Sequence, residues 1–131
     1  MFDGDLLAER ARVTPDKLAL VSVETGERLT YGQLDARARA AAAALHNLGL
    51  RQGDRFGVLG RNCVEFVAIF FGSLKLGTIV VPLSTRATEH ERAQIAEDCG
   101  MKMVVELSVV ELSALSSQLS AFWGIQCCRV T

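Results

Sequence analysis

The chain has 131 residues, with 14 Lys and Arg against 15 Asp and Glu, so its formal net charge is -1. Half of the residues are hydrophobic and 22% are charged, a balance typical of a globular protein and too apolar for a disordered tail. Because no basic surplus is available to neutralise a run of phosphates, we expect no nucleic-acid partner. The length suits one buried core, which predicts a single domain over residues 1–131.

The cysteines and the apolar stretches argue against a metal site, secretion and membrane insertion. None of the four cysteines forms a CxxC pair, and Cys127 and Cys128 are adjacent. The first ten residues mix acidic and basic side chains with apolar ones, unlike a signal peptide. The apolar stretch Phe66 to Leu74 is far shorter than the roughly 20 residues that cross a bilayer. We therefore expect reduced thiols, a cytoplasmic location and no transmembrane segment.

The first predicted elements are two extended runs, Leu18 to Val23 and Glu27 to Leu29. They flank Thr25-Gly26, a turn-like break that favours a β-hairpin. From Arg55 onward, short β-branched runs alternate with helical patterns, as in a parallel sheet built from strand-helix-strand units. The expected strands of this sheet are 55–59, 78–81, 101–105 and 125–130.

The predicted helices have matching start and stop signals. Four pairs have the spacing of a capping box: Thr30 with Gln33, Asn62 with Glu65, Thr88 with Glu91, and Ser108 with Glu111. Each helical pattern is followed by a glycine, at positions 49, 77, 100 and 124. These signals predict helices over 31–48, 63–76, 89–99 and 109–123. The fold class is then α/β, a mostly parallel sheet with helices on both faces, preceded by the hairpin.

The first two helices differ in their apolar patterns. In the helix 31–48, one stripe of Leu and Ala faces inward, while Asp35, Arg37 and Arg39 fall outside the stripe. In the helix 63–76, apolar side chains occur nearly all round, with Gly72 permitting close approach of another element. We expect the second helix to be buried on most sides.

Two segments resemble the opening motifs of the adenylate-forming, AMP-dependent ligase family, which includes acyl-CoA synthetases. They are Leu29-Thr30-Tyr31-Gly32-Gln33-Leu34 and Leu74-Lys75-Leu76-Gly77-Thr78-Ile79-Val80-Val81-Pro82-Leu83. Between them, Gly49 to Arg55 resembles the family's link from helix to strand, and the order of the three pieces also matches. Physically both motifs are scaffold: the first is a capped helix start and the second is a helix end leading into a strand that stops at Pro82.

The resemblance covers residues from about Thr14 to Val105, the amino-terminal portion of such an enzyme. It implies formation of an acyl-adenylate and then an acyl-CoA, with ATP, Mg²⁺ and CoA as the needs of the complete enzyme. The family's Ser/Thr/Gly-rich phosphate loop and its carboxy-terminal adenylation lysine have no counterpart in these 131 residues. We therefore expect no catalytic residue, no cofactor and no ligase activity in this chain alone.

Arg86 is the candidate binding residue. It follows an expected strand end, where ligands of parallel sheets bind, and a guanidinium suits phosphate. In a complete enzyme it would contact a phosphate of CoA; the alternative is a solvated arginine paired with Glu89 or Glu91. The other candidates carry weaker signals: His46 and His90 suit the surface, Trp123 suits a core, and Gly57 to Gly60 lacks the G-x-G-x-x-G pattern of dinucleotide loops.

Three functions remain open at this stage. The first is an amino-terminal fragment of a carboxylic acid–CoA ligase, the acid being a fatty acid, with an apolar face that meets the rest of the ligase or another copy. The second is a stand-alone, non-catalytic module that binds a partner protein. The third is an unrelated nucleotide-binding domain, for which no phosphate cradle is found in the sequence.

Overall fold

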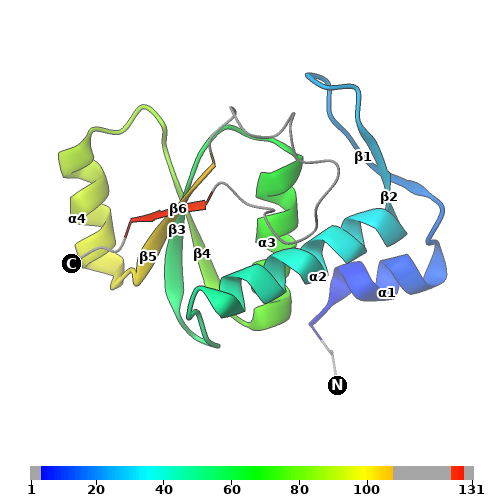
Figure 1. Ribbon diagram of the computed structural model, residues 1–131, viewed down its shortest axis with the longest axis horizontal. Coiled ribbons are helices and arrows are strands. Elements are labelled where there is room, and N and C mark those ends of the chain that lie inside the picture. The colour runs from blue at the N-terminus through cyan, green and yellow to red at the C-terminus, as the bar shows by residue number, and fades with distance from the viewer. Residues whose placement is uncertain (1–3, 108–124, 129–131) are drawn as a thin grey trace. The chain divides into compact units, whose positions relative to one another are not determined.

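The computed structural model describes residues 4–107 and 125–128, which form two compact units. The first unit combines Met1–Asp54 with Asn62–Ile79, and the second combines Arg55–Arg61 with Val80–Thr131. Figure 1 shows the helices and strands of both. The first unit contains α1 (Leu6–Val13), β1 (Leu18–Val21), β2 (Arg28–Thr30), α2 (Tyr31–Asn47) and α3 (Val64–Leu76). The second contains β3 (Arg55–Leu59), α4 (Glu89–Cys99), β5 (Met103–Leu107), β6 (Ile125–Cys128) and most of β4 (Ile79–Leu83).

Helix α1 is an element that the sequence patterns did not predict. Its N-cap is Asp5, whose Oδ1 accepts a hydrogen bond from the Ala8 amide at 2.9 Å. Only Leu7 is buried, at 4% exposure, so the helix has no apolar stripe long enough to stand out in the sequence. Eight residues are too few to form a stable helix without tertiary contacts.

The predicted hairpin is confirmed in β1 and β2, which pair antiparallel. Gly26 lies in the turn with a φ of 72°, and its amide donates to the Ser22 carbonyl at 2.8 Å. A positive φ is easily adopted by glycine, which explains why a turn forms here. The register shifts between Leu18 and Leu20, so the two strands do not pair evenly along their length.

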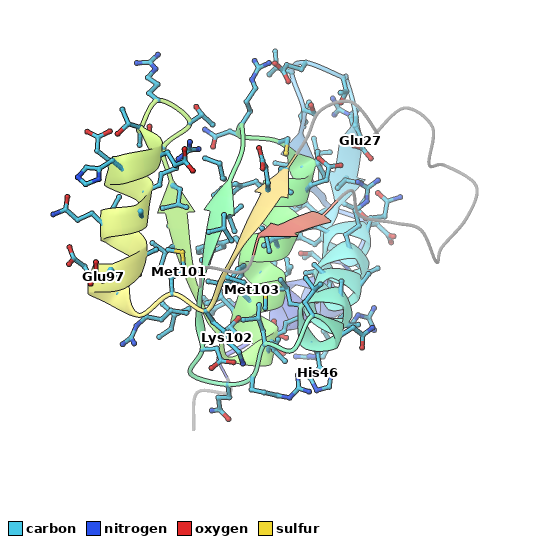
Figure 2. The ribbon with its side chains drawn as sticks, turned by 60° about the vertical axis from the view of Figure 1, so that its left-hand side comes forward. Glu27, His46, Glu97, Met101, Lys102 and Met103 are labelled. Carbon is cyan, nitrogen blue, oxygen red and sulfur yellow. The ribbon has the colours of Figure 1, made fainter. Side chains whose placement is uncertain are left out.

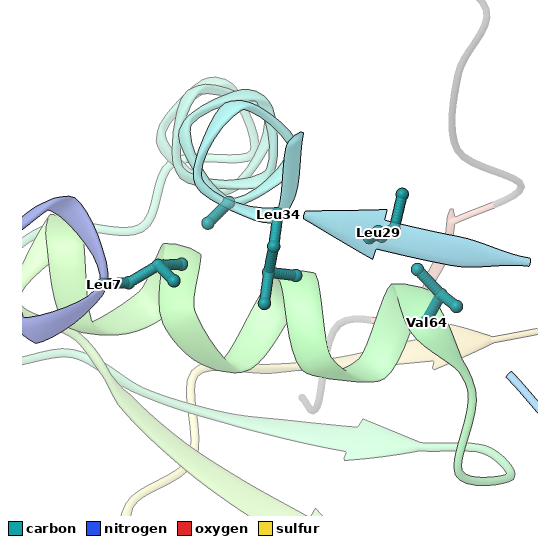
Figure 3. Packing of buried hydrophobic residues seen from close by; sticks show 5 residues of the cluster. Leu7, Leu29, Leu34 and Val64 are labelled. Atoms are coloured by element: carbon teal, nitrogen blue, oxygen red, sulfur yellow. The ribbon is translucent and has the colours of Figure 1, made fainter. Parts of the chain in front are cut away.

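The start of α2 confirms the first predicted capping box. The Gln33 amide donates to Thr30 Oγ1 at 3.2 Å, and the Thr30 amide donates to Gln33 Oε1 at 3.0 Å. Leu29 and Leu34 lie in one core cluster, as a hydrophobic staple requires (Figure 3). The other buried members of this cluster are Leu7, Ala38 and Val64.

One expectation about α3 was wrong. Its N-cap is Cys63 rather than Asn62, and no side chain caps it, so the Asn62 and Glu65 capping box is absent. The expected burial on most sides is confirmed, because every residue of the helix except Phe70 and Leu74 is buried or only partly exposed. Phe70, which is 39% exposed, and Leu74, which is 48% exposed, leave one apolar strip of the helix uncovered. The predicted left-handed stop is confirmed at Gly77, with a φ of 75°.

Close packing of α2 and α3 depends on Gly72, as its position in the pattern indicated. A Cβ at this position would come within 2.8 Å of the Ala38 carbonyl oxygen and 2.9 Å of the Ala42 amide nitrogen. Both atoms belong to the α2 backbone, which cannot move aside as a flexible side chain would. Glycine is therefore required for this helix contact.

In the second unit, four strands form one sheet in the order β4-β3-β5-β6. Strands β3 and β5 pair in parallel, with Phe56 opposite Met103, and β6 pairs antiparallel with β5. The arrows of β4, β3 and β5 point toward the same edge in Figure 2. The α/β class, with a mostly parallel sheet after a hairpin, is thus confirmed.

Two strands of this sheet, β4 and β5, have boundaries that differ from the predicted ones. Strand β4 continues through Pro82 to Leu83 instead of ending at the proline, which is tolerated because β4 is an edge strand of the sheet. Strand β5 begins at Met103 rather than Met101, because the Met101 amide donates to the Ala96 carbonyl and closes the end of α4 at Gly100. Figure 2 shows Met101 and Met103 in this region.

Helix α4 also confirms its predicted signals. The Glu91 amide donates to Thr88 Oγ1 at 3.2 Å, the Thr88 amide donates to Glu91 Oε2 at 2.7 Å, and Gly100 ends the helix with a φ of 63°. Ala96, Met101 and Leu83 form the buried cluster between this helix and the sheet. The predicted helix over 109–123, with Ser108, Glu111 and Gly124, lies outside the described residues.

Candidate functional site

A hollow of about 200 Å³ lies in the second unit, at the edge where β3 and β5 end. Its walls come from the ends of two neighbouring strands, the loop after β4 and the first turns of α4. The lining residues are Leu59, Gly60, Arg61, Thr85, Arg92, Glu106 and Leu107.

The topology explains why these residues meet. Strand β4 lies on one side of β3 and β5 lies on the other, so the chain order reverses between β3 and β5. In open α/β sheets, ligands bind at the carboxyl ends of the strands beside such a reversal. Leu59 pairs with Glu106 in the last register position of these two strands, and both residues line the hollow.

Gly60 brings the two strand ends close together. A Cβ on Gly60 would lie 2.7 Å from the Leu107 Cβ and 3.3 Å from the Leu107 carbonyl oxygen. A larger residue here would have to push β5 away from β3. The glycine thus fixes the spacing between two of the walls of the hollow.

The polar groups around the hollow suit an anion better than a metal ion. Arg61 and Arg92 supply guanidinium donors and Thr85 supplies a hydroxyl, whereas Glu106 is the one carboxylate in the lining. Mg²⁺ prefers several oxygen ligands. Within the described residues, no group of three or more His, Cys, Asp and Glu side chains could hold a metal ion.

Arg86, the candidate from the sequence, is exposed and does not line the hollow. Its amide donates to Ser84 Oγ at 3.2 Å, in the loop that also carries Thr85. Among the described residues its guanidinium forms no ion pair, and Glu91 is occupied by Thr88. The alternative pairing with Glu89 or Glu91 is therefore not present. Arg86 directly follows Thr85, a residue that does line the hollow, in the chain.

Sequence reasoning missed a buried ionic cluster in the first unit. The Lys75 ammonium donates to Asp5 Oδ2 and to Asp35 Oδ1, each at 2.6 Å, and the Lys75 side chain is only 9% exposed. Asp35 also pairs with Arg39 at 3.2 Å. The prediction that Asp35 lies outside the buried stripe of α2 is wrong, because the residue is 8% exposed. Its charge is accommodated by a lysine 40 residues away, a pairing that no local pattern indicates.

The cluster shifts the titration of its members. Burial opposes the charge on Lys75, but hydrogen bonds to Asp35 and Asp5 outweigh it and raise the pKa of the ammonium above its ordinary value. Burial likewise tends to raise the pKa of Asp5. Hydrogen bonds from Lys75 and from the Ala8 amide outweigh this effect, so the pKa of the Asp5 carboxyl is lowered. Both charged forms are therefore favoured in the folded chain.

Within the part of the chain that the structure describes, the remaining sequence candidates do not meet in a common site. His46 and His90 are exposed, as expected, and His46 lies at the end of α2 (Figure 2). Cys63 is a free thiol whose pKa is raised by burial, which disfavours the reactive thiolate. Trp123 lies outside the described residues. No helix among the residues that the structure describes has the length and apolar character needed to cross a membrane.

Comparison with known proteins shows where the chain belongs. The family model for AMP-binding enzymes matches residues 7–123. The chain belongs to this family. Over 102 residues it is 41% identical to the long-chain-fatty-acid–CoA ligase FadD13 of Mycobacterium tuberculosis, covering 78% of this chain and 20% of that protein. It is 37% identical over 100 residues to 4-coumarate–CoA ligase 2 of Oryza sativa, covering 76% of this chain and 18% of the relative.

Solved structures of the family agree with the fold. The N-terminal domain of FACL13 from Mycobacterium tuberculosis matches with a TM-score of 0.75 at 41% identity, covering 79% of this chain and 26% of that one. O-succinylbenzoate coenzyme A synthetase from Bacillus subtilis matches with a TM-score of 0.76 at 29% identity, covering 81% of this chain and 22% of that one. The resemblance to adenylate-forming ligases is thus confirmed. The chain spans about a fifth of the length of the curated relatives it matches.

Proposed function

We propose that the chain is the amino-terminal portion of an ATP-dependent carboxylic acid–CoA ligase whose substrate is a fatty acid and which acts in the cytoplasm. The observation that carries this proposal is the 41% identity to a relative named as a long-chain-fatty-acid–CoA ligase. The role of these residues is to build the scaffold of the ligase. ATP, Mg²⁺ and CoA would be needs of the complete enzyme, and the 131-residue chain would be inactive alone.

A chimera tests this function directly. The segment of FadD13 that aligns with this chain is replaced by the present sequence, and acyl-CoA formation from a long-chain acid, ATP and CoA is measured. We expect the chimera to keep activity within about tenfold of FadD13, while the 131-residue chain alone forms none. A chimera that folds, as judged by circular dichroism and gel filtration, and yet lacks activity would contradict the proposal.

Arg86 belongs to the same proposal as a contact for a CoA phosphate. It is exposed and forms no ion pair among the described residues, so its guanidinium is available to a ligand. In the chimera, Arg86→Gln should raise the KM for CoA about tenfold and leave the KM values for ATP and acid unchanged. Equal effects on all three substrates would argue for a structural role instead.

A stand-alone partner-binding module is the second candidate function. It is favoured by the exposed pair Phe70 and Leu74, which lie four residues apart on α3 and offer an apolar face. This function gains support if the purified chain is a stable monomer and the chimera shows no ligase activity. Recovery of activity in the chimera would instead favour the ligase.

A further inference from the structure

Helix α1 is attached to the rest of the first unit by few side chains. Leu7 is its one buried residue, whereas Leu6 and Val13 are 62% and 56% exposed. The Arg10 guanidinium lies over the Tyr31 ring at the start of α2, 5.4 Å from the ring centroid. A helix of eight residues is unstable without tertiary contacts, so α1 keeps its shape only while these attachments hold.

The carboxylate of Asp5 attaches α1 through two bonds at once. Its Oδ1 accepts a hydrogen bond from the Ala8 amide at 2.9 Å and thereby caps the helix. Its Oδ2 accepts from the Lys75 ammonium at 2.6 Å and thereby joins the helix to α3. Because the same charge holds the cap and the link to α3, a single proton added to Asp5 weakens both.

The charged groups that face Asp5 stay paired when it leaves. From α3 the facing group is Lys75, and from α2 it is Asp35, which also pairs with Arg39 at 3.2 Å. Lys75 keeps its bond to Asp35, so detachment of α1 leaves no buried charge without a partner. The Asp5 side chain is 34% exposed, and protons from the solvent therefore reach it.

Backbone bonds fasten the chain directly after α1, which limits the part that can detach to the helix itself. The Gly32 amide donates to the Pro15 carbonyl at 3.0 Å. The Tyr31 amide donates to the Lys17 carbonyl, also at 3.0 Å. Between these bonds and the helix lies Thr14, the C-cap, with a φ of -137° and a ψ of 65°, outside the helical region. The helix can thus swing away while the hairpin after it stays in place.

From these observations we propose that α1 is a strap that opens independently of the rest of the fold, with the Asp5 carboxylate as its latch. Opening uncovers the surface of α2 and α3 beneath Leu7 and leaves Lys75 paired with Asp35. The pKa of Asp5 is lowered in the closed state, so closure is favoured above the ordinary carboxyl pKa and is lost as the pH falls through the folded value. Strap opening does not depend on ligase activity.

Hydrogen exchange of the 131-residue chain in low concentrations of urea tests whether α1 opens by itself. The amides of residues 8–14 report on α1, and those in the middle of α2 report on global unfolding. We expect protection factors in α1 at least about tenfold below those in α2 and nearly insensitive to urea, because opening of one helix exposes little surface. Equal protection of α1 and α2 at every urea concentration would overturn the proposal.

Gly72→Ala tests the same independence by a different route. The added Cβ disturbs the contact between α2 and α3, which is present whether the strap is open or closed. Protection of α2 should therefore fall about thirtyfold, while protection of α1 should stay within about twofold of the wild-type value. A parallel loss in both helices would mean that α1 opens only when the whole unit unfolds.

Two substitutions at the start of α1 test the latch. Asp5→Asn keeps a capping side chain but loses the charge, so at neutral pH it should lower α1 protection about tenfold and flatten the decline of this protection toward acid pH. The matched control, Glu9→Gln, breaks an exposed ion pair with Arg12 and should change α1 protection by no more than about twofold. Equal effects of the two substitutions, or an acid decline that persists in Asp5→Asn, would contradict Asp5 as the latch.

Discussion

At Lys75, one ammonium group serves two carboxylates that come from different parts of the first unit. Asp5 is the N-cap of α1 and Asp35 lies in α2, while Lys75 itself lies in α3. Each carboxylate oxygen is 2.6 Å from the lysine nitrogen. A buried charge that loses its partner is costly, so the three elements depend on this one side chain.

Replacement of Lys75 by methionine should therefore destabilise the chain. Asp35 would remain buried with only Arg39 beside it, and Asp5 would lose its link to α3. We expect the free energy of unfolding to fall by about 3 kcal/mol in urea titrations. Arg12→Met, which removes the exposed partner of Glu9, is the matched control and should have no resolvable effect. Similar losses in both variants would argue against a special role for the buried cluster.

The same cluster predicts how stability depends on pH. The pKa of Asp5 is lowered on folding, so its contribution is present above the ordinary carboxyl pKa and is lost as the pH falls through the folded value. The pKa of Lys75 is raised, so its contribution is present below the ordinary lysine pKa and is lost as the pH rises through the folded value. Unfolding free energies measured across pH should decline at both ends.

Two variants isolate these contributions. In Asp5→Asn, the decline at the acid end should become shallower, because one carboxylate with a lowered pKa is gone. In Lys75→Met, the decline at the alkaline end should also become shallower. Unchanged slopes in both variants would mean that other groups set the pH dependence.

At the scale of elements, the helix ends show which sequence signals act in the fold. Thr30 and Thr88 have both hydrogen bonds of a capping box, while Asn62, with the same spacing to a glutamate, caps nothing. The physical difference is the starting point of the helix: α3 begins after Cys63, one residue later than the pattern indicated. The spacing of a capping box is necessary for the motif but does not determine which residue becomes the N-cap.

Substitutions of Thr88 and Asn62 should have different effects on stability, because only Thr88 caps a helix. Thr88→Ala removes the acceptor for the Glu91 amide and should lower the free energy of unfolding by about 1 kcal/mol. Asn62→Ala has the same predicted spacing but removes no cap, and it should leave stability unchanged. Chemical denaturation of both variants measures the difference, and a loss of equal size for Asn62→Ala would refute this distinction.

Contact between α2 and α3 offers a second test at this scale. Gly72→Ala adds a single methyl group, which meets the α2 backbone at 2.8 Å and 2.9 Å. Because neither helix backbone can yield easily, we expect a loss of about 2 kcal/mol in unfolding free energy. The helix preference of alanine would by itself raise stability, so the sign of the change reports the packing.

Much of this architecture follows from local chemistry, and the parts that do not are non-local. The helix stops at Gly77 and Gly100 and the turn at Gly26 were predictable, because glycine adopts a positive φ at low cost. Helix α1 and the Lys75 cluster were not, since they depend on contacts between residues far apart in the chain. At the candidate site, Arg86 was chosen by its place after a strand, but the hollow is formed by Arg61 and Arg92, which only the strand order brings together.

For the whole molecule, the central fact is that the chain spans about a fifth of the length of its relatives. Phe70 is held edge-to-face against Phe71, with ring centroids 5.4 Å apart, and yet it is 39% exposed. A large aromatic side chain left in contact with water beside Leu74, which is 48% exposed, is typical of a surface that another protein segment covers. In the proposed ligase, that segment would belong to the remainder of the enzyme.

The isolated chain should therefore associate through this face of α3. Sedimentation velocity over a range of concentrations should show oligomers. Association would bury Phe70 and Leu74, and each Å² of apolar surface removed from water stabilises the complex by about 25 cal/mol. Phe70→Lys combined with Leu74→Lys should shift the population to monomer while circular dichroism stays unchanged. The matched control is Val23→Lys, at a residue of the hairpin that is 96% exposed. This variant should leave association intact. A wild-type chain that remains monomeric at every concentration would instead show that this face of α3 does not drive self-association and, together with an inactive chimera, would favour the partner-binding module.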